Sequence, residues 1–313
     1  MSSDSKKIHI LDSSLRDGAQ GEGISFSVQD KIHVVVDTIA VSHETPLKDD
    51  PRCHVLRLIT RHGNEEWWDG ERSLEEMFAM VEKTGQLPGT SQPPVGYIHE
   101  LFANLAKEGK KVIYIAVDSV LSGTYQTCCM VAKQVMSEIK GADIRCVDGL
   151  TAACPLSGMA MEVLRLIDSG VEDMDKLEAF ARDCALRTET YFTVKTLDYL
   201  QKGGRIGAVG ALVGNILGIR PIVHLDREGK LLIGDKARTR KKILKRMVEL
   251  ACSHDPIEEI FVAHAVVEDE AQALAKEMQE RYPGVPVMVT SIGTVLAAHL
   301  GPGAIGVFVR RKA

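Results

Sequence analysis

The chain has 313 residues, of which 45% are hydrophobic and 26% charged, so it can bury a substantial core and has room for two domains. Its net charge of -5 argues against a nucleic-acid-binding protein, because phosphate binding requires a concentrated positive surface. It has no apolar stretch of the roughly 18 residues that cross a membrane, no signal-peptide core and no framework spacing among its seven cysteines, so we expect a cytoplasmic protein with reduced thiols.

The first predicted element is the short strand IHIL, which is followed by the loop SLRDGAQGEGISFS at 14–27. Arginine and aspartate after such a strand resemble the start of the metal-dependent citramalate and isopropylmalate synthase barrels. This resemblance would make Asp17 a metal ligand and Arg16 a contact to a keto acid. The ten histidines include no H-x-H pair to complete a metal site, and the likeness ends far short of the roughly 250 residues of a barrel. We therefore expect an N-terminal extension at 1–31, packed on the first domain, and no metal.

From residue 32 onward, short β-branched runs alternate with helical patterns, which predicts an α/β fold. The predicted strands are 32–41, 54–60, 111–117 and 143–148, and the predicted helices are 97–109, 124–139 and 156–167. The polar segment 168–173 is a candidate boundary. We therefore predict a first domain at 32–170, in which a mostly parallel sheet is flanked by helices and carries the binding loops.

The rest of the chain predicts a smaller α/β domain at 171–313. It begins with a helix, a strand and a glycine-rich stretch, at 174–186, 191–194 and 201–219. Next come two strands joined by the polar turn DREG, at 220–237, and a basic helix at 239–252. They are followed by a strand at 257–265, an acidic helix from 268 and a last strand at 285–290. The basic helix begins within KARTRKKILKR, where seven of eleven residues are basic, so this surface can attract an anion or an acidic partner.

Two loops of the first domain carry small hydroxyl residues. Thr90 and Ser91 precede two prolines that stiffen their loop, and Ser122, Gly123 and Thr124 lie between a predicted strand and a predicted helix. Free backbone N–H groups and the positive end of a helix dipole favour a negative ligand at such a place. Serine and threonine are also ordinary helix N-caps, so each loop alone is compatible with a purely structural role.

Six motifs follow one another along the chain: TSQPP, LSGTYQ, YFTVKTLDYLQKGGRIG, LVGNILGIRPIVHLD, KARTRKK and AAHLGPGAIGVFV. In their order and spacing they resemble the DegV family, bacterial fatty-acid-binding proteins that partner a fatty-acid kinase, over residues 32–309. The resemblance implies a carrier that buries one acyl chain between its domains and presents the carboxylate to the kinase, which makes the acyl phosphate. It implies no catalysis by this chain and no cofactor. Burial of a long chain, at about 0.8 kcal/mol per CH₂, would drive binding.

The same resemblance implies two sets of site residues. The fatty-acid carboxylate would be bound by Thr90, Ser91, Ser122, Gly123 and Thr124. The kinase encounter or phosphate handling would use Arg205, Arg238 and His299.

Each member of the second set also has a structural alternative. Arg205 follows a pair of glycines and could tie down its own loop, and Arg238 could belong to a solvated basic face. His299 precedes Gly-Pro-Gly and could be a buried histidine with satisfied hydrogen bonds.

The chain departs from the DegV pattern in three places. VDTIAV replaces a hydroxyl-rich strand end of the TDSTAD type, Pro94 stands where a serine is common, and VDGLTAAC lacks an Asp-Ser pair. These changes remove hydroxyl groups near the expected pocket. A carrier of another lipid or carboxylate therefore stays open as an alternative. The first thirty residues keep a second alternative open, a metal-dependent acyl transferase related to the synthases.

Overall fold

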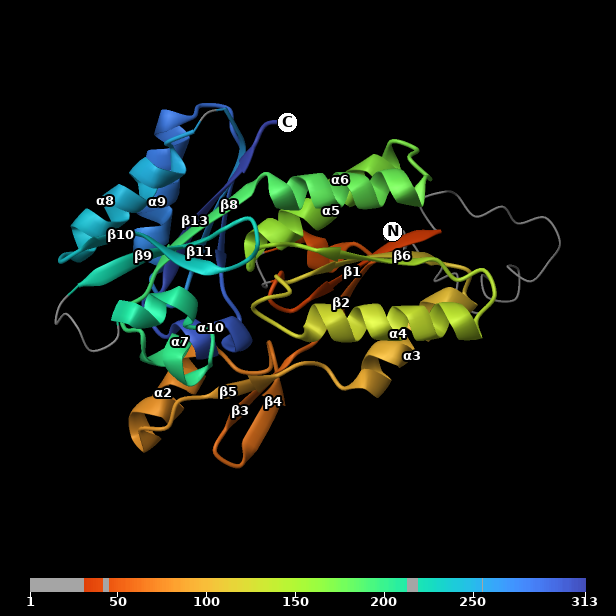
Figure 1. The fold of residues 1–313 in the computed structure, drawn as a ribbon, viewed down its shortest axis with the longest axis horizontal. Helices are drawn as coiled ribbons and strands as arrows, with labels where there is room; N and C mark the ends of the chain where they lie inside the picture. Colours follow the sequence, from red (N-terminus) through yellow and green to blue (C-terminus); the bar gives the residue numbers. More distant parts are fainter. Residues whose placement is uncertain (1–30, 42–44, 213–218, 255) are drawn as a thin grey trace, which may run out of the picture.

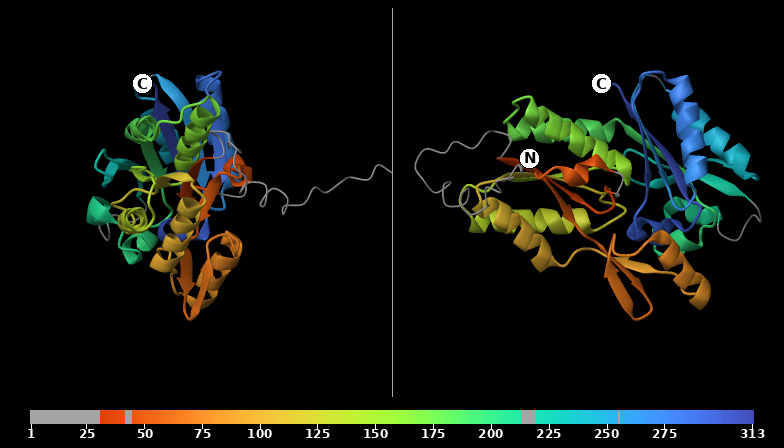
Figure 2. Two further views of the ribbon diagram at one scale, coloured as in Figure 1. Left: turned by 90° about the vertical axis from the view of Figure 1, so that its right-hand side faces the viewer. Right: turned by 180° about the vertical axis from the view of Figure 1, so that it is seen from behind.

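The computed structural model describes residues 31–41, 45–212, 219–254 and 256–313, so Arg16, Asp17 and nearly all of the predicted extension lie outside the described residues. The described chain forms a parallel four-stranded sheet, a six-stranded sheet beside it and a small three-stranded sheet (Figure 1). Figure 2 shows that the small sheet projects from one side of the other two. The α/β fold with two sheet regions is confirmed.

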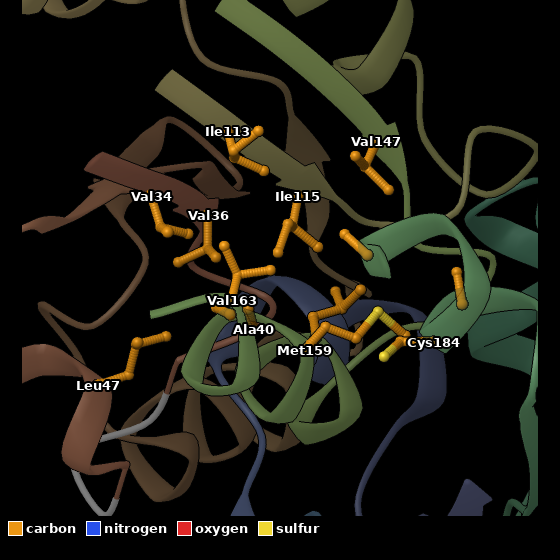
Figure 3. Close-up of a cluster of buried hydrophobic side chains, with 14 of the residues drawn as sticks. Val34, Val36, Ala40, Leu47, Ile113, Ile115, Val147, Met159, Val163 and Cys184 are labelled. Atoms are coloured by element: carbon orange, nitrogen blue, oxygen red, sulfur yellow. The ribbon is translucent and has the colours of Figure 1, made fainter. Parts of the chain in front are cut away.

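The parallel sheet has the order β2-β1-β6-β7 and consists of β1 (Ile32–Asp37), β2 (Cys53–Leu56), β6 (Lys111–Ala116) and β7 (Ile144–Asp148). One face is covered by α3 (Val95–Lys107) and α4 (Thr124–Glu138), and the other by α5 (Cys154–Asp168) and α6 (Met174–Leu186). All six residues of β1 are buried, because helices cover the sheet on both sides. Figure 3 shows Val36 and Ile115 of the strands pointing toward Met159 and Val163 of α5.

The six-stranded sheet has the order β10-β9-β8-β13-β11-β12, and all its pairs are antiparallel except β11 with β12. Its strands are β8 (Thr188–Thr193), β9 (Arg220–Leu225), β10 (Leu231–Ala237), β11 (Ile257–His264), β12 (Val287–Ser291) and β13 (Ile305–Arg311). Helices α8 (Arg240–Ala251) and α9 (Glu268–Arg281) cover one face. The apolar cluster on the other face includes residues of α7 (Asp198–Lys202), η3 (Gly207–Leu212) and α10 (Thr294–Leu300). The hairpin predicted around DREG is therefore present, as are the basic and acidic helices.

The small sheet has the order β4-β3-β5 and consists of β3 (Ile59–His62), β4 (Glu65–Trp68) and β5 (Gly89–Ser91). Between β4 and β5 lies α2 (Leu74–Thr84), which starts at a capping box formed by Ser73 and Glu76. A short helix, η2 (Pro46–Asp49), precedes β2. Through β5, the small sheet brings the hydroxyls of Thr90 and Ser91 beside the six-stranded sheet.

Two predicted strands were wrong in extent, and the strand predicted to be the last, 285–290, is followed by one more, β13. The first, 32–41, ends at Asp37, because the Asp37 carboxylate accepts the Ile39 N–H at 3.0 Å and turns the chain. The second, 54–60, is two strands in different sheets, β2 and β3. The break falls at Leu58, whose N–H donates to the Thr38 hydroxyl at 3.2 Å and whose carbonyl accepts the Asp69 N–H at 2.9 Å. At Leu58 a side-chain acceptor, the Thr38 hydroxyl, thus takes the N–H that a continuous strand would pair, which apolar periodicity does not reveal.

Helix α6 packs with the parallel sheet, although its residues fall in the second predicted domain, 171–313. Leu177, Ala181 and Cys184 are fully buried in the same cluster as the strands of that sheet. This packing favours a boundary after α6, near Arg187, and the division into domains stays a prediction.

Candidate functional site

A cavity of about 380 Å³ lies between the parallel sheet and the six-stranded sheet. Its walls come from the loops after β1, β6 and β7, from β8, β11 and β13, and from α10. Most lining side chains are apolar, including Ile39, Val117, Phe192, Ile292 and Phe308. An apolar cavity at the carboxyl ends of parallel strands, with a few polar groups, is typical of a small-molecule site.

The β5 side of this cavity carries Thr90 and Ser91. The Thr90 hydroxyl lies 2.8 Å from Nε2 of His299, which comes from α10. The Ser91 hydroxyl oxygen is buried and has no hydrogen-bond partner among the described residues. A buried hydroxyl costs free energy unless it is paired, so Ser91 has capacity to bind a polar ligand atom in the cavity.

The loop before α4 brings Ser122 and Gly123 to the same wall. The Ser122 hydroxyl lies 2.9 Å from the Thr124 hydroxyl and accepts the Thr124 N–H at 3.3 Å. Thr124 is fully buried and does not line the cavity. Of the five predicted carboxylate-binding residues, four therefore line the cavity, whereas Thr124 supports Ser122 from behind.

Arg205 and His299 also line the cavity. The Arg205 guanidinium donates to the carbonyl of Gly203 in its own loop at 2.6 Å and to that of Leu121 at 3.0 Å, so it ties its own loop to the Ser122 loop. Burial, with a smaller effect of Arg205, lowers the pKa of His299 to about 4. The imidazole is therefore neutral at physiological pH, and its Nδ1 has no hydrogen-bond partner among the described residues.

Gly203 is required for the position of His299. A Cβ added at this glycine would lie 2.2 Å from Nδ1 of His299 and 3.1 Å from the Tyr199 carbonyl oxygen. We expect Gly203→Ala to displace the imidazole, break its contact with Thr90 and lower the free energy of unfolding by about 1–3 kcal/mol in urea denaturation. Gly96→Ala is the control, since an added Cβ there meets no atom within 4 Å. Equal stability of the two variants would contradict this role.

Arg238 lies apart from the cavity. It is exposed and borders a separate hollow with Lys236, Thr239 and Lys242, at the start of α8. The structure therefore brings Arg205 and His299 to the predicted carboxylate loops but not Arg238, whose role as a partner contact stays a prediction.

Several lining residues were missed by the sequence reasoning. Gln92 follows Ser91 directly, and its side-chain oxygen accepts the Thr127 hydroxyl at 2.9 Å, which joins the two loops. Its position in the TSQPP motif was a usable signal. Thr190 lies on β8, just before the predicted strand 191–194, and His264 lies within the predicted strand 257–265, and neither was singled out as a lining residue.

Among the described residues, no group of three or more His, Cys, Asp or Glu side chains could hold a metal ion. Within the same ranges, no helix is long and apolar enough to cross a membrane.

The family model of DegV proteins matches residues 31–312 of the chain. The chain belongs to the DegV family. It is 30% identical to a DegV domain-containing protein of Clostridium perfringens, over 89% of this chain and 97% of the relative. It is 33% identical to a DegV domain-containing protein of Halalkalibacterium halodurans, over 88% and 97% of the two chains.

Solved DegV structures are similar to the whole described fold. The fatty acid binding DegV family protein from Streptococcus agalactiae has a TM-score of 0.81 and 26% identity, with 90% of this chain and 99% of that chain covered. DegV of Bacillus subtilis, a fatty acid binding protein, has a TM-score of 0.78 and 28% identity, with 90% and 99% covered. These DegV structures share the fold and bind fatty acids.

Proposed function

We propose that this DegV protein binds one long-chain fatty acid in the cavity between its two larger sheets. The acyl chain would lie against the apolar wall, and the carboxylate would accept hydrogen bonds from Ser91 and Ser122. The observation that carries the proposal is the buried, unpartnered hydroxyl of Ser91 at the wall of an otherwise apolar cavity. The fatty-acid binding of the two similar DegV proteins supports it.

The electrostatics of the site suit a carboxylate that must stay reactive. His299 is neutral, and Arg205 already donates to two backbone carbonyls, so no bidentate arginine pair would enclose the ligand. Neutral hydroxyl donors bind a carboxylate oxygen while leaving its other lone pairs available. We propose that the carrier presents this oxygen to a separate fatty-acid kinase and performs no catalysis itself.

The proposed location is the cytoplasm. All seven cysteines are free of disulfides, which supports a reducing compartment.

Titration with palmitic acid and with its methyl ester tests the carboxylate site. The two ligands bury the same chain, but the ester carries no charge and accepts weaker hydrogen bonds. We expect the free acid to bind roughly tenfold or more tightly, because charge-assisted hydrogen bonds are stronger than neutral ones. Equal affinities would show that the hydroxyl cluster does not bind a carboxylate, and binding of neither ligand would reject a fatty-acid carrier.

Arg238→Ala tests the proposed kinase contact. Because Arg238 is exposed and remote from the cavity, we expect unchanged palmitic-acid affinity and roughly tenfold slower acyl-phosphate formation with a fatty-acid kinase, as expected for loss of a steering charge. Lys140→Ala, at an exposed cation near the end of α4, is the control and should have no effect. Equal rates of acyl-phosphate formation for both variants would contradict the kinase contact and would indicate that Arg238 belongs only to a solvated basic face.

A further inference from the structure

The loop that carries Ser122 and Gly123 is shaped by Asp118, the second residue after β6. The Asp118 carbonyl accepts the N–H groups of Leu121 and Ser122, both at 3.1 Å. One carboxylate oxygen, Oδ1, accepts the Val120 N–H at 2.7 Å. The orientation of the Ser122 loop therefore depends on Asp118.

The second sheet touches Asp118 through the turn of the β9–β10 hairpin, which reaches toward the loops of the first sheet in Figure 1. A Cβ added at Gly229 would lie 2.3 Å from Oδ2 of Asp118 and 2.5 Å from Oδ1, so the two residues are in direct contact. Gly229 also has a φ of +77°, which favours glycine. Asp118 is fully buried, and its Oδ2 has no hydrogen-bond partner among the described residues.

The groups around this contact do not compensate a negative charge on Asp118. Asp148, at the end of β7, accepts the Ser119 N–H at 3.1 Å and is a nearby carboxylate. The hairpin turn contributes Asp226 and three exposed charged residues, Arg227, Glu228 and Lys230. Lys230 pairs with Glu228 at 2.5 Å.

Arg205, which follows α7 and contacts the Ser122 loop, donates to the backbone carbonyls of Leu121 and Gly203. No salt bridge to Asp118 occurs within the described part of the chain. Burial, with smaller effects of the charges of Asp148 and Asp226, raises the pKa of Asp118 to about 6, while the backbone N–H groups of Val120 and Leu121 oppose this rise.

We propose that Asp118 and Gly229 form a pH-dependent latch between the two sheets. When the carboxyl is neutral, the hairpin turn docks on the Ser122 loop. When the carboxyl ionises, a buried charge that makes no salt bridge among the described residues faces two other carboxylates, and the turn loosens.

The latch lies at the mouth of the candidate site. A hollow of about 510 Å³ is lined by Ser122 and Gly123 of the loop and by Gly229 and Leu231 of the hairpin. Ser122 and Leu231 also line the main cavity. Movement of the turn therefore changes access to that cavity, whatever its ligand.

The raised pKa determines the direction of the pH dependence. Docking is fully favoured below the ordinary aspartate pKa of about 3.9, and this preference is lost as pH rises through the pKa of about 6 in the docked state. Because the pKa of Asp118 differs between the docked and undocked states, the equilibrium constant for docking falls about tenfold between pH 5 and pH 7.5.

Hydrogen exchange of the ligand-free protein tests the latch independently of fatty-acid binding. Amide protection in the turn, 226–231, is measured at pH 5 and pH 7.5 after correction for intrinsic exchange rates. We expect the wild type to lose about tenfold protection at the higher pH, Asp118→Asn to keep similar protection at both, and Glu228→Gln to behave as the wild type. Gly229→Ala should exchange quickly at both pH values, because its Cβ excludes docking.

Equal protection of the wild-type turn at the two pH values would overturn the latch, even if Asp118→Asn failed to fold. An Asp118→Asn protein that retained the full pH dependence would overturn the assignment to Asp118.

Discussion

Replacement of both Ser91 and Ser122 by alanine is expected to weaken palmitic-acid binding by roughly 100-fold. Each hydroxyl would donate one hydrogen bond to a carboxylate inside an apolar cavity, and each such bond contributes about 1.5 kcal/mol or more. A fluorescent fatty-acid displacement assay measures the change. Ser137→Ala is the control, since Ser137 is exposed on α4 and its hydroxyl donates to the Gln134 carbonyl.

The single variant Ser91→Ala separates a binding role from a structural one. The Ser91 hydroxyl is buried without a partner among the described residues, so its removal should raise the stability of the ligand-free protein by about 1 kcal/mol while weakening binding. A hydroxyl that served only to stabilise the fold would show the opposite sign in denaturation. Loss of stability together with unchanged affinity would therefore reject Ser91 as a ligand contact.

Filling the cavity with Ala263→Phe is expected to reduce palmitic-acid affinity by roughly 60-fold and to leave decanoic-acid affinity nearly unchanged. Ala263 lies on β11 opposite Gly306, and both residues line the cavity. The added ring would displace about three methylene groups, each worth about 0.8 kcal/mol on burial. Competition titrations with the two acids measure this change in chain-length preference.

Ala275→Phe is the matched control, because Ala275 is buried in the core between α9 and the other face of the same sheet. Both variants overpack a core and should lose about 1–3 kcal/mol of stability, but only Ala263→Phe should alter binding. Equal loss of affinity for both acids, or an equal effect of the two variants, would show that the acyl chain does not occupy this cavity.

Local sequence patterns predicted most elements because apolar periodicity and turn residues act over short distances. The β9–β10 hairpin and α8, with Thr239 as its N-cap, follow from such signals. The break between β2 and β3 could not be predicted in this way. It depends on bonds that Leu58 makes with Thr38 and Asp69, and neither residue is its neighbour in the chain.

Part of the candidate site could likewise be predicted from local patterns, and part depends on residues distant in the chain. Thr90, Ser91, Ser122 and Gly123 were recognisable because they lie in short motifs at strand and helix ends. The burial of Thr124 behind Ser122 depends on how α4 packs, which side-chain type alone does not determine.

The contacts between the sheets at the site could not be predicted from local sequence patterns. The position of His299 against Thr90 and the contact of Gly229 with Asp118 join residues more than 100 positions apart. Such contacts follow from the packing of the two sheets.

Native mass spectrometry of the purified protein, followed by extraction and identification of the released molecule, is the decisive test of fatty-acid binding. We expect one equivalent of a long-chain fatty acid, lost on denaturation and reduced in the Ser91, Ser122 double variant. A protein that carries no lipid and does not take up palmitic acid when supplied, or that holds a divalent metal ion in its place, would contradict it.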